Sequence, residues 1–428
     1  MPERLIFHVD VNSAYLSWES VRRISEGKQD LREIPSAVGG EPGKRTGIIL
    51  AKSIPAKKYG VTTGEPVSMA LRKCPELVLV PPDFRLYEKN SRAFMEICRK
   101  YAPVLQKFSV DECFLDMTGT SLLYPDPIAL AHRIKDEIRD TLGFTVNVGV
   151  GSNRLLAKMA SDFEKPDKVH TLFLSEIREK MWPLPVGDLL YIGKMSAARL
   201  QAAGIRTIGD LACMNIAGVQ AILGEKGGQS AWESANGMDD SPVTEEREEP
   251  KGYSISTTLE EDVTTLEQAR HVLLMLADHV AGRMRADGAK AYCVAVDIRF
   301  SKLQNIHGNT PSTRFTNKSH QRKLESATDV TDEIYHTATE LFQELWRGEP
   351  LRLMGIALSD LTKDTYEQTA LFRDEKRERA KKLDEVMDKI RGKYGQGAVF
   401  RAGAGDMERI GRKTKAQMDP EDQQKEWE

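Results

Sequence analysis

The order of short apolar segments in the first part of the chain constrains the fold more strongly than any other feature. Residues 5–10 have the continuous apolar character of a buried strand, and residues 104–108 and 113–117 are typical of two further strands joined by a tight turn. A helix over 128–142 and a strand over 144–150 follow. The succession of strand, helix, two strands, helix and strand predicts a split βαβ sheet of the ferredoxin-like kind.

A long insertion, over about residues 15–80, separates the first strand from the rest of this sheet. Asn12 or Ser13 is predicted to cap a helix at its start, because apolar residues recur at helical spacing over 14–21. Asn153 is predicted to begin another helix after the last strand.

Three carboxylates are expected to meet at one end of the predicted sheet. Asp10 ends the first strand, and Asp111 and Glu112 lie in the turn of the hairpin. Taken singly, Asp10 has the plain interpretation of a helix cap, and the acidic pair that of ordinary turn chemistry. Together they would repel one another unless divalent cations neutralise them, and hard oxygen ligands suit Mg²⁺. Two such ions about 3.5–4 Å apart can activate an attacking hydroxyl and stabilise a leaving pyrophosphate.

The pattern changes after residue 170. Short helices surround a glycine turn at 191–193, and residues 242–252 have the prolines and charges of a linker. In the remaining chain, helices are expected over 265–286, 329–346 and 374–391, and strands over 291–300 and 351–358.

Charge is unevenly distributed along the chain, whose net charge is −3. Residues 281–323 contain nine Lys and Arg against two acids, whereas residues 245–262 contain seven acids against two bases. The basic segment favours a nucleic-acid-binding surface, and chance clustering on a solvated face is the alternative.

Length and composition indicate a globular protein of two to four domains, with 428 residues of which 40% are hydrophobic and 29% charged. No stretch approaches the about 18 uninterrupted apolar residues of a membrane span, and no signal-peptide pattern is present at the N-terminus. We therefore expect no membrane association and a cytoplasmic location. The five cysteines lack a C-x-x-C pair, which favours reduced, mostly buried thiols over disulfides or a zinc site.

Four segments together resemble the Y family of DNA polymerases, the error-prone enzymes of translesion synthesis. Residues 7–15 (FHVDVNSAY) and 108–116 (FSVDECFLD) are similar to the two metal-binding motifs of that family. Residues 51–61 resemble its finger segment, and residues 149–161 resemble its late-palm segment. The segments occur in the order of the family, and the similarity extends over roughly residues 4–400.

The resemblance implies an α+β fold of several domains. They are a ferredoxin-like palm with inserted fingers, a helical thumb with a helix–hairpin–helix-like turn, and an α/β little finger. The implied boundaries are 1–13 and 82–170 for the palm, 14–81 for the fingers, 171–241 for the thumb, 242–252 for a linker, 253–362 for the little finger and 363–428 for a tail. The thumb turn departs from the common pattern, because Tyr191 stands where glycine is usual.

The implied activity is template-directed DNA synthesis from deoxynucleoside triphosphates, of low fidelity because the chain leaves no region for a proofreading exonuclease. Asp10, Asp111 and Glu112 would be catalytic and, with the carbonyl of Val11, would bind two Mg²⁺ ions that Mn²⁺ can replace. Tyr15 would lie under the sugar and exclude ribonucleotides. The alternative for Tyr15 is an ordinary core aromatic on the first helix.

Contacts to the incoming triphosphate are expected from Ser53, Lys57 and Lys165. An ordinary surface lysine at a helix end is the alternative for Lys165. The finger segment departs from the family, because Ile54 and Lys57 stand where tyrosine and arginine are usual. Ile54 cannot donate a hydrogen bond, and lysine lacks the planar two-pronged grip of arginine on phosphate. The lost contacts to the triphosphate could instead come from Lys52, Ser53 or Lys58.

DNA binding is expected from six residues in the thumb turn and the little finger: Gly193, Lys194, Arg314, Lys318, Arg322 and Lys323. Residues 368–372 (QTALF) resemble the pentapeptide with which bacterial polymerases bind the sliding clamp, through Gln368, Leu371 and Phe372. In the alternative interpretation, Leu371 and Phe372 anchor the tail on the little finger. The implied partners are primer–template DNA, deoxynucleoside triphosphates and the clamp, and the implied state is a monomer.

Two other functions share part of this pattern. A catalytically inactive polymerase-like scaffold of a mutagenesis complex would keep the fold but lose carboxylates, whereas all three are present here. A nucleotide cyclase shares a ferredoxin-like palm with paired metal carboxylates. It would not need a thumb, a basic C-terminal domain or a clamp peptide.

Overall fold

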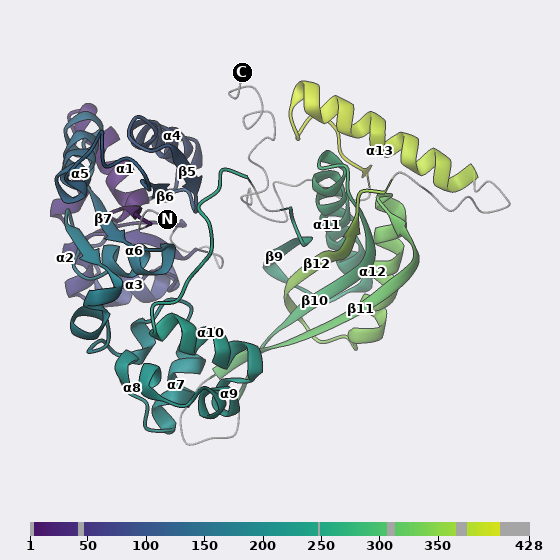
Figure 1. Cartoon of the computed structure of the whole chain (residues 1–428). Coiled ribbons are helices and arrows are strands. Elements are labelled where there is room, and N and C mark those ends of the chain that lie inside the picture. The colour runs from purple at the N-terminus through teal and green to yellow at the C-terminus, as the bar shows by residue number, and fades with distance from the viewer. Residues whose placement is uncertain (1–3, 42–46, 247–248, 306–312, 365–374, 403–428) are drawn as a thin grey trace. The chain divides into compact units, whose positions relative to one another are not determined.

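A computed structural model describes residues 4–41, 47–246, 249–305, 313–364 and 375–402, with side chains omitted over 302–305 and 313–315 (Figure 1). The chain divides into two compact units, residues 1–247 and 248–428. In the described residues, no helix combines the length and apolar character needed to cross a bilayer. The five cysteines all lie in the described part; none forms a disulfide, and only Cys213 is exposed.

The first unit is built on a five-stranded sheet in the order β5-β6-β1-β7-β8. Its strands are β1 (Ile6–Val11), β5 (Val104–Lys107), β6 (Glu112–Asp116), β7 (Val146–Gly151) and β8 (Val169–Leu172). Strand β1 pairs antiparallel with both β6 and β7, and β8 adds parallel to β7. With α4 (Phe84–Arg99) and α5 (Pro127–Leu142), this order confirms the predicted ferredoxin-like palm.

Alternation along β1 separates two environments, because successive side chains of a strand point to opposite faces. Val9 packs into the main core with α4 and α5, whereas Asp10 lies on the face that α6 (Arg154–Ser161) partly covers. A Cβ at Gly149 of β7 would lie 1.9 Å from the carbonyl oxygen of Ala157. Glycine therefore permits the close approach of α6, which fixes the position of the segment that follows it.

The start of the insertion differs from prediction. Helix α1 (Ala14–Ser25) has Ser13 at its N-cap, but no side-chain cap hydrogen bond forms. The side chain of Asn12 is used elsewhere, because its Nδ2 donates to Oδ1 of Asn147 at 3.1 Å. Helix α4, which completes the ferredoxin-like unit, was not predicted.

The fingers contain a 3₁₀ turn (Leu31–Glu33), β2 (Ser36–Gly39), β3 (Ile49–Lys52), α2 (Ile54–Lys58), α3 (Val67–Lys73) and β4 (Val78–Val80).

The thumb is a group of short helices with a core of its own. Its elements are two 3₁₀ turns (Leu174–Glu176 and Val186–Asp188), a π-helical turn (Ile177–Met181), α7 (Lys194–Ala202), α8 (Ile208–Cys213), α9 (Ile216–Leu223) and α10 (Glu225–Ala235). Leu200, Ile208 and Leu211 are fully buried in its core. Trp182 Nε1 donates to the carbonyl of Ala235 at 3.1 Å, which joins the start of the thumb to its last helix.

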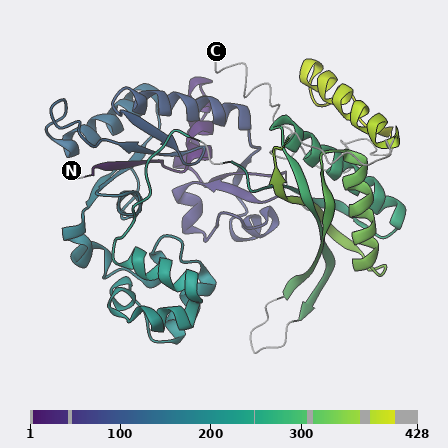
Figure 2. The ribbon, with the colours of Figure 1, turned by 45° about the vertical axis from the view of Figure 1, so that its right-hand side comes forward.

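The second unit contains an antiparallel sheet in the order β11-β10-β12-β9. Its elements are β9 (Gly252–Val263), α11 (Leu266–Ala286), β10 (Lys290–Asn305), β11 (Thr313–Thr328), α12 (Thr331–Leu345) and β12 (Leu351–Thr362). Helices α11 and α12 cover one face, and the far ends of β10 and β11 project beyond them (Figure 2). Strands β9 and β11 were not predicted, because most of their side chains are polar.

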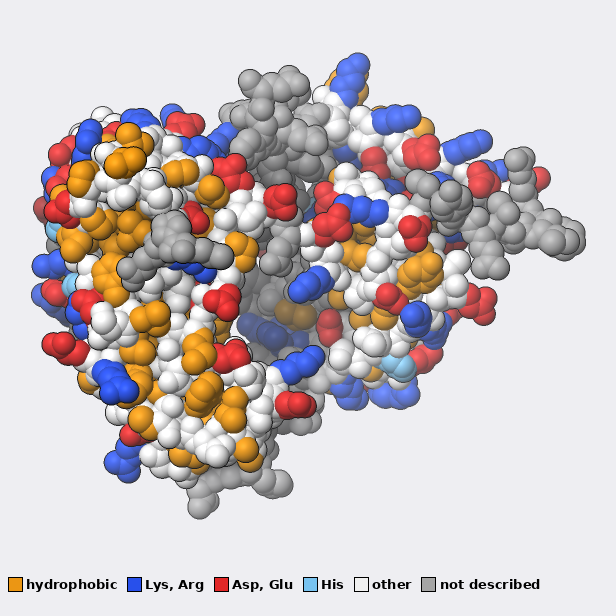
Figure 3. All heavy atoms as spheres, in the orientation of Figure 1, with side chains coloured by type: hydrophobic (Ala, Val, Ile, Leu, Met, Phe, Trp, Pro, Cys, Tyr) orange, Lys and Arg blue, Asp and Glu red, His pale blue; other side chains and the backbone are white. Residues whose placement is uncertain are grey.

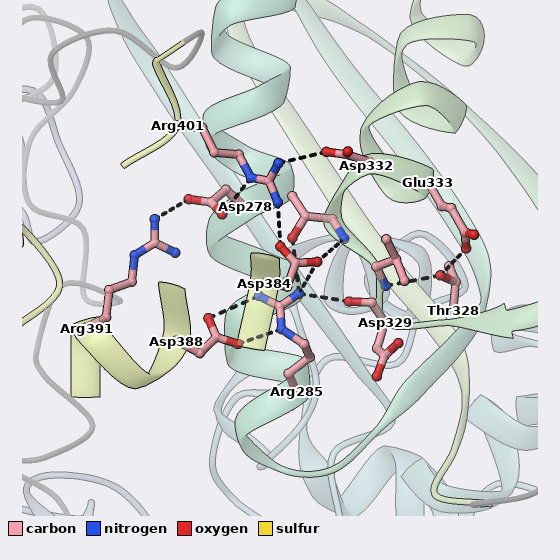
Figure 4. Close-up of polar contacts among 12 residues, drawn as sticks. Asp278, Arg285, Thr328, Asp329, Asp332, Glu333, Asp384, Asp388, Arg391 and Arg401 are labelled. Carbon is pink, nitrogen blue, oxygen red and sulfur yellow. Dashed lines mark hydrogen bonds and ion pairs between the residues drawn. The ribbon is translucent and has the colours of Figure 1, made fainter. Parts of the chain in front are cut away.

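Helix α13 (Glu375–Tyr394) was predicted as part of a separate tail beyond residue 362, but it packs on α11 and α12. Arg285 of α11 contacts Asp388 of α13 through two nitrogens, at 2.6 and 3.1 Å. Arg391 of α13 donates to Asp278 of α11 at 2.6 Å. The buried Asp384 accepts the backbone N–H of Thr331 at 2.8 Å and contacts Arg285 and Arg401 (Figure 4). Charged side chains thus fasten α13 to this unit.

Candidate active site

The two strands β1 and β6 bring the predicted carboxylates to one end of the palm sheet. Asp10 and Glu112 are direct neighbours in the antiparallel register, so their side chains lie on the same face. The N–H of Val11 donates to the carbonyl of Asp111 at 3.0 Å, which places Asp111 at the same end. Ser109 Oγ donates to the Asp111 carboxylate at 2.6 Å and orients it within the turn.

Two lysines contact these carboxylates. Lys158 Nζ on α6 lies 2.9 Å from Glu112 Oε2. Lys165, in the segment after α6, contacts the carboxylate of Asp10 and also lies 2.8 Å from Asp162 Oδ1. Among the described residues, no three His, Cys, Asp or Glu side chains are arranged to share one ion. The predicted three-carboxylate convergence is therefore absent from this arrangement, in which ammonium groups neutralise two of the acids.

Burial and the neighbouring lysines shift the pKa values of Asp10 and Glu112 in opposite directions. Burial raises the pKa of Asp10 to about 6, although the charge of Lys165 opposes this. Burial also works against the charge of Glu112, but favourable interactions with His8 and Lys158 lower its pKa to about 2. Partial burial by itself would lower the pKa of Lys165. The negative charge of Asp10 has the larger effect and raises that pKa.

Two buried amides, which were not predicted as site residues, hold the segment that carries Lys165. Asn147 Nδ2 donates to the carbonyls of Ser161 and Glu164 at 3.0 and 2.7 Å. Its Oδ1 accepts from Asn12, the residue that was expected to cap a helix. The sequence does carry a signal for Asn147, because it is a polar residue within a strand that is predicted to be buried. The structure buries it fully, so its amide must find hydrogen-bond partners inside the protein.

His8 supports the site from within the sheet and was also not predicted. It is fully buried, and its Nδ1 lies 2.8 Å from Ser161 Oγ. Its Nε2 lies 3.7 Å from Glu112 Oε2, beyond hydrogen-bonding distance. Burial lowers the pKa of His8, which favours the neutral imidazole beside the carboxylates.

Tyr15 lies in the first turn of α1, between the core and the carboxylate end of the sheet. Its ring stacks on Tyr87 with centroids 4.5 Å apart, and it is half-buried. Burial and the nearby charge of Asp111 both raise its pKa. The ring of Tyr15 thus packs against Tyr87 as a core aromatic would, and it also lies near the carboxylate of Asp111.

The finger residues divide into a structural group and an exposed group. The hydroxyl of Ser53 donates to the carbonyl of Ile34 and accepts the N–H groups of Ser36 and Ala56, so it has no spare hydrogen-bonding capacity. Lys57 is exposed, as is Ile54. Burial and the neighbouring charge of Lys57 lower the pKa of Lys52, which indicates two cations side by side.

The thumb turn explains why glycine is usual where this chain has Tyr191. The φ of Tyr191 is 68°, a left-handed conformation that glycine adopts without strain. Gly193 follows as the N-cap of α7, with open space around the position of a Cβ, and Lys194 is the first helical residue. The N-terminus of α7 is therefore accessible beside an exposed lysine.

The basic residues of the second unit do not form one patch. In the register of β10 and β11, Lys318 and Arg322 lie opposite core residues of the helix-covered face, whereas Lys323 lies opposite Cys293 on the open face. Arg322 also bonds to the carboxylates of Glu340 and Glu344 on α12. The side chain of Arg314 and the peptide Gln368, Leu371 and Phe372 lie outside the described residues. On the face drawn in Figure 3, acidic, basic and apolar side chains are interspersed.

Comparisons with known proteins agree with this architecture. Sequence models match residues 9–162 (impB/mucB/samB family), 188–239 (DNA polymerase-iota, thumb domain) and 250–371 (impB/mucB/samB family C-terminal domain). DNA polymerase IV of Clostridium acetobutylicum is 41% identical, over 93% of this chain and 98% of its own length. DNA polymerase IV of Acetivibrio thermocellus is 36% identical, over 93% of this chain and 97% of its own.

A solved Y-family DNA polymerase chimera has the same fold, with a TM-score of 0.69 and 23% identity. It covers 84% of this chain, and the match includes all of that protein. The three sequence matches lie within residues 9–371, and the first of them includes the segments that carry Asp10, Asp111 and Glu112. The chain belongs to the Y family of DNA polymerases.

Proposed function

We propose that this polymerase extends a primer by two-metal nucleotidyl transfer, with Asp10, Asp111 and Glu112 as metal ligands. As a Y-family member the protein is a DNA-directed DNA polymerase of translesion synthesis, which acts on primer–template DNA and deoxynucleoside triphosphates with divalent metal. The observation that carries the finer proposal is the register of β1 and β6, which pairs Asp10 with Glu112 beside Asp111.

The donor set fits a hard divalent cation. Carboxylate oxygens and the carbonyl of Val11 at an open sheet end are the ligands that Mg²⁺ prefers, and Mn²⁺ accepts the same set. When bound, the ions would activate the primer 3′-hydroxyl and stabilise the leaving pyrophosphate. The chain itself would orient these ligands through the sheet register and through Ser109 and Lys158.

Nucleotide selection is proposed for Tyr15, and triphosphate binding for Lys57 and Lys165. Tyr15 is supported by its position beside Asp111, where a rigid ring held by Tyr87 would block a 2′-hydroxyl. Lys57 is supported by its exposure next to Lys52. Ser53 is left out, because its hydroxyl is fully used within the fingers.

DNA contacts are proposed at the N-terminus of α7 and along strand β11 of the second unit. Backbone N–H groups at Gly193 and Lys194 can bind phosphate without reading sequence. Lys323 lies on the open face, and Arg314, Lys318 and Arg322 complete the proposed set. Residues 368–372 are proposed to bind a sliding clamp, and the enzyme to work as a monomer in the cytoplasm, where these substrates occur.

The proposal is tested by primer extension with a matched pair of variants in β6 and its turn. Asp111→Asn should reduce nucleotide incorporation by more than about a thousandfold, because it removes a charged metal ligand. Asp116→Asn at the far end of β6 should retain activity, because Asn keeps the oxygen that accepts the N–H of Thr118. Near-wild-type incorporation by Asp111→Asn would refute the proposed site.

A further inference from the structure

The lysine on Asp10 differs from the lysine on Glu112 in how firmly it is held. Lys158 lies on α6, is nearly buried and has its ammonium 5.3 Å from the ring centre of Phe108. Lys165 lies beyond the end of α6, and 38% of its side chain is exposed. Its second partner, Asp162, is itself half-exposed. Lys165 therefore has room to leave Asp10, whereas Lys158 is fixed by packing.

The contact between Lys165 and Asp10 uses an oxygen that a metal ion would need. Asp10 is only 5% exposed, so few directions are open for a second cation to approach its carboxylate. An ammonium and a divalent ion on the same buried carboxylate would repel one another strongly in this weakly screened position. Metal and Lys165 should therefore exclude each other at Asp10.

A released Lys165 would remain close to the site. The amides of Asn12 and Asn147 hold the segment from Ser161 to Asp167 against the palm sheet, so the backbone of Lys165 stays in place. Only its side chain would have to turn outward, toward the solvent side. A ligand with several negative charges at the carboxylate end of the sheet would then attract it.

We propose that Lys165 is an exchangeable cation, which occupies Asp10 in the metal-free enzyme and moves onto the incoming triphosphate when a metal ion takes Asp10. This inference rests on the proposed metal site. Because both ligands bias the same side chain, metal and nucleotide should strengthen each other's binding by the same factor. Binding of the triphosphate would pull Lys165 away from Asp10, and binding of metal would free Lys165 for the triphosphate.

The test measures Mn²⁺ binding to the full chain by electron paramagnetic resonance, at pH 8 and without DNA or nucleotide. Lys165→Met should bind Mn²⁺ about tenfold more tightly than the wild type, because the competing cation is gone. Lys168→Met is the matched control. It removes the same charge from the same segment, where Lys168 lies 3.8 Å from Glu164 and does not contact Asp10.

A second variant separates competition from a general loss of charge. Lys165→Arg keeps the charge and can bind a carboxylate with two nitrogens, so it should not bind Mn²⁺ more tightly than the wild type. Equal affinity of Lys165→Met and Lys168→Met, with Mn²⁺ bound to both, would overturn the exchange while leaving the metal site intact. Wild-type binding that Asp10→Asn does not weaken would overturn the metal site and the exchange together.

Discussion

Two of the acid–base clusters in the described residues contain buried aspartates but differ in construction. In the palm, lysines contact Asp10 and Glu112, and one of the lysines is partly exposed. In the second unit, arginines contact Asp278, Asp384 and Asp388 between helices (Figure 4). The first cluster lies at an open sheet end, whereas the second joins α13 to the elements beneath it.

The type of base distinguishes what each cluster does. An arginine binds a carboxylate with a rigid, two-pronged fork, as Arg285 does with Asp388, and this geometry fixes two elements relative to each other. A lysine is a compact point charge that neutralises a carboxylate without fixing direction, and another cation can replace it. A buried acid paired with arginine thus serves structure here, and one paired with lysine can serve chemistry.

The largest effect on stability is expected at Asp384. Asp384→Ala leaves Arg285 and Arg401 without a shared partner and the N–H of Thr331 without an acceptor. The docking of α13 should weaken by about 3 kcal/mol, because breaking a buried pair leaves an uncompensated charge. Hydrogen exchange of α13 peptides should accelerate by about a hundredfold.

The neighbouring residue supplies the control for this prediction. Glu385 is exposed on the same helix, so Glu385→Ala should change the exchange of α13 very little. If α13 exchanges equally fast in both variants, the cluster does not hold α13. The second cluster would then not be structural, and the proposed contrast between the two clusters would fail.

The next prediction concerns how Asp10 makes the stability of the metal-free protein depend on pH. Its pKa is raised to about 6 when folded, so the folded state holds the proton more tightly than the unfolded chain. The contribution of this carboxyl to stability is therefore fully present below about pH 4 and is lost as the pH rises to about 6, by about 3 kcal/mol. This loss should be absent in Asp10→Asn.

The comparison is made by hydrogen exchange of β1 peptides in the presence of a chelator at pH 4.5 and pH 7, after correction for the intrinsic rate. A wild type whose protection changes with pH as little as that of Asp10→Asn would show that burial does not disfavour this charge. Such a result would place Asp10 among the structural acids.

The smallest effect is expected on changing the type of base at Arg391. Arg391→Lys keeps a charge near Asp278 but cannot also donate to the carbonyl of Val399, as Nε of Arg391 does at 3.0 Å. The free energy that holds α13 in place should fall by about 1 kcal/mol, the usual contribution of one hydrogen bond. Exchange of α13 should become about fivefold faster. The converse change Lys389→Arg, at an exposed position of α13, should have no effect.

Much of the palm could be predicted from sequence because its central strands, β1 and β7, are short, mostly apolar and buried on both faces. The same pattern predicted the carboxylates, since Asp10 and Glu112 interrupt or end such strands. Helix α4 was missed between the long insertion and the hairpin, and β9 and β11 were missed because most of their side chains are polar.

The residues that support the site could not be predicted in the same way. Lys158 and Asn147 act on Glu112 and on the segment of Lys165 only after the chain folds α6 back onto the sheet. Helix α13 was predicted, but its docking was not, because Asp384 and Arg391 are among the few residues it buries. Hydrophobic periodicity carries no information about contacts made by ion pairs.

The central claim is that the acids of the palm serve catalysis and those of the second unit serve structure. One measurement tests it most directly: the single-turnover rate of nucleotide incorporation at saturating DNA and Mg²⁺, with Asp→Asn made at Asp10 or at Asp384. We expect Asp10→Asn to lose more than about a thousandfold in rate while it stays folded, because a charged ligand is lost. We expect Asp384→Asn to stay within about tenfold of the wild type wherever it is folded. Comparable losses in the two variants, or a larger loss at Asp384, would contradict the account.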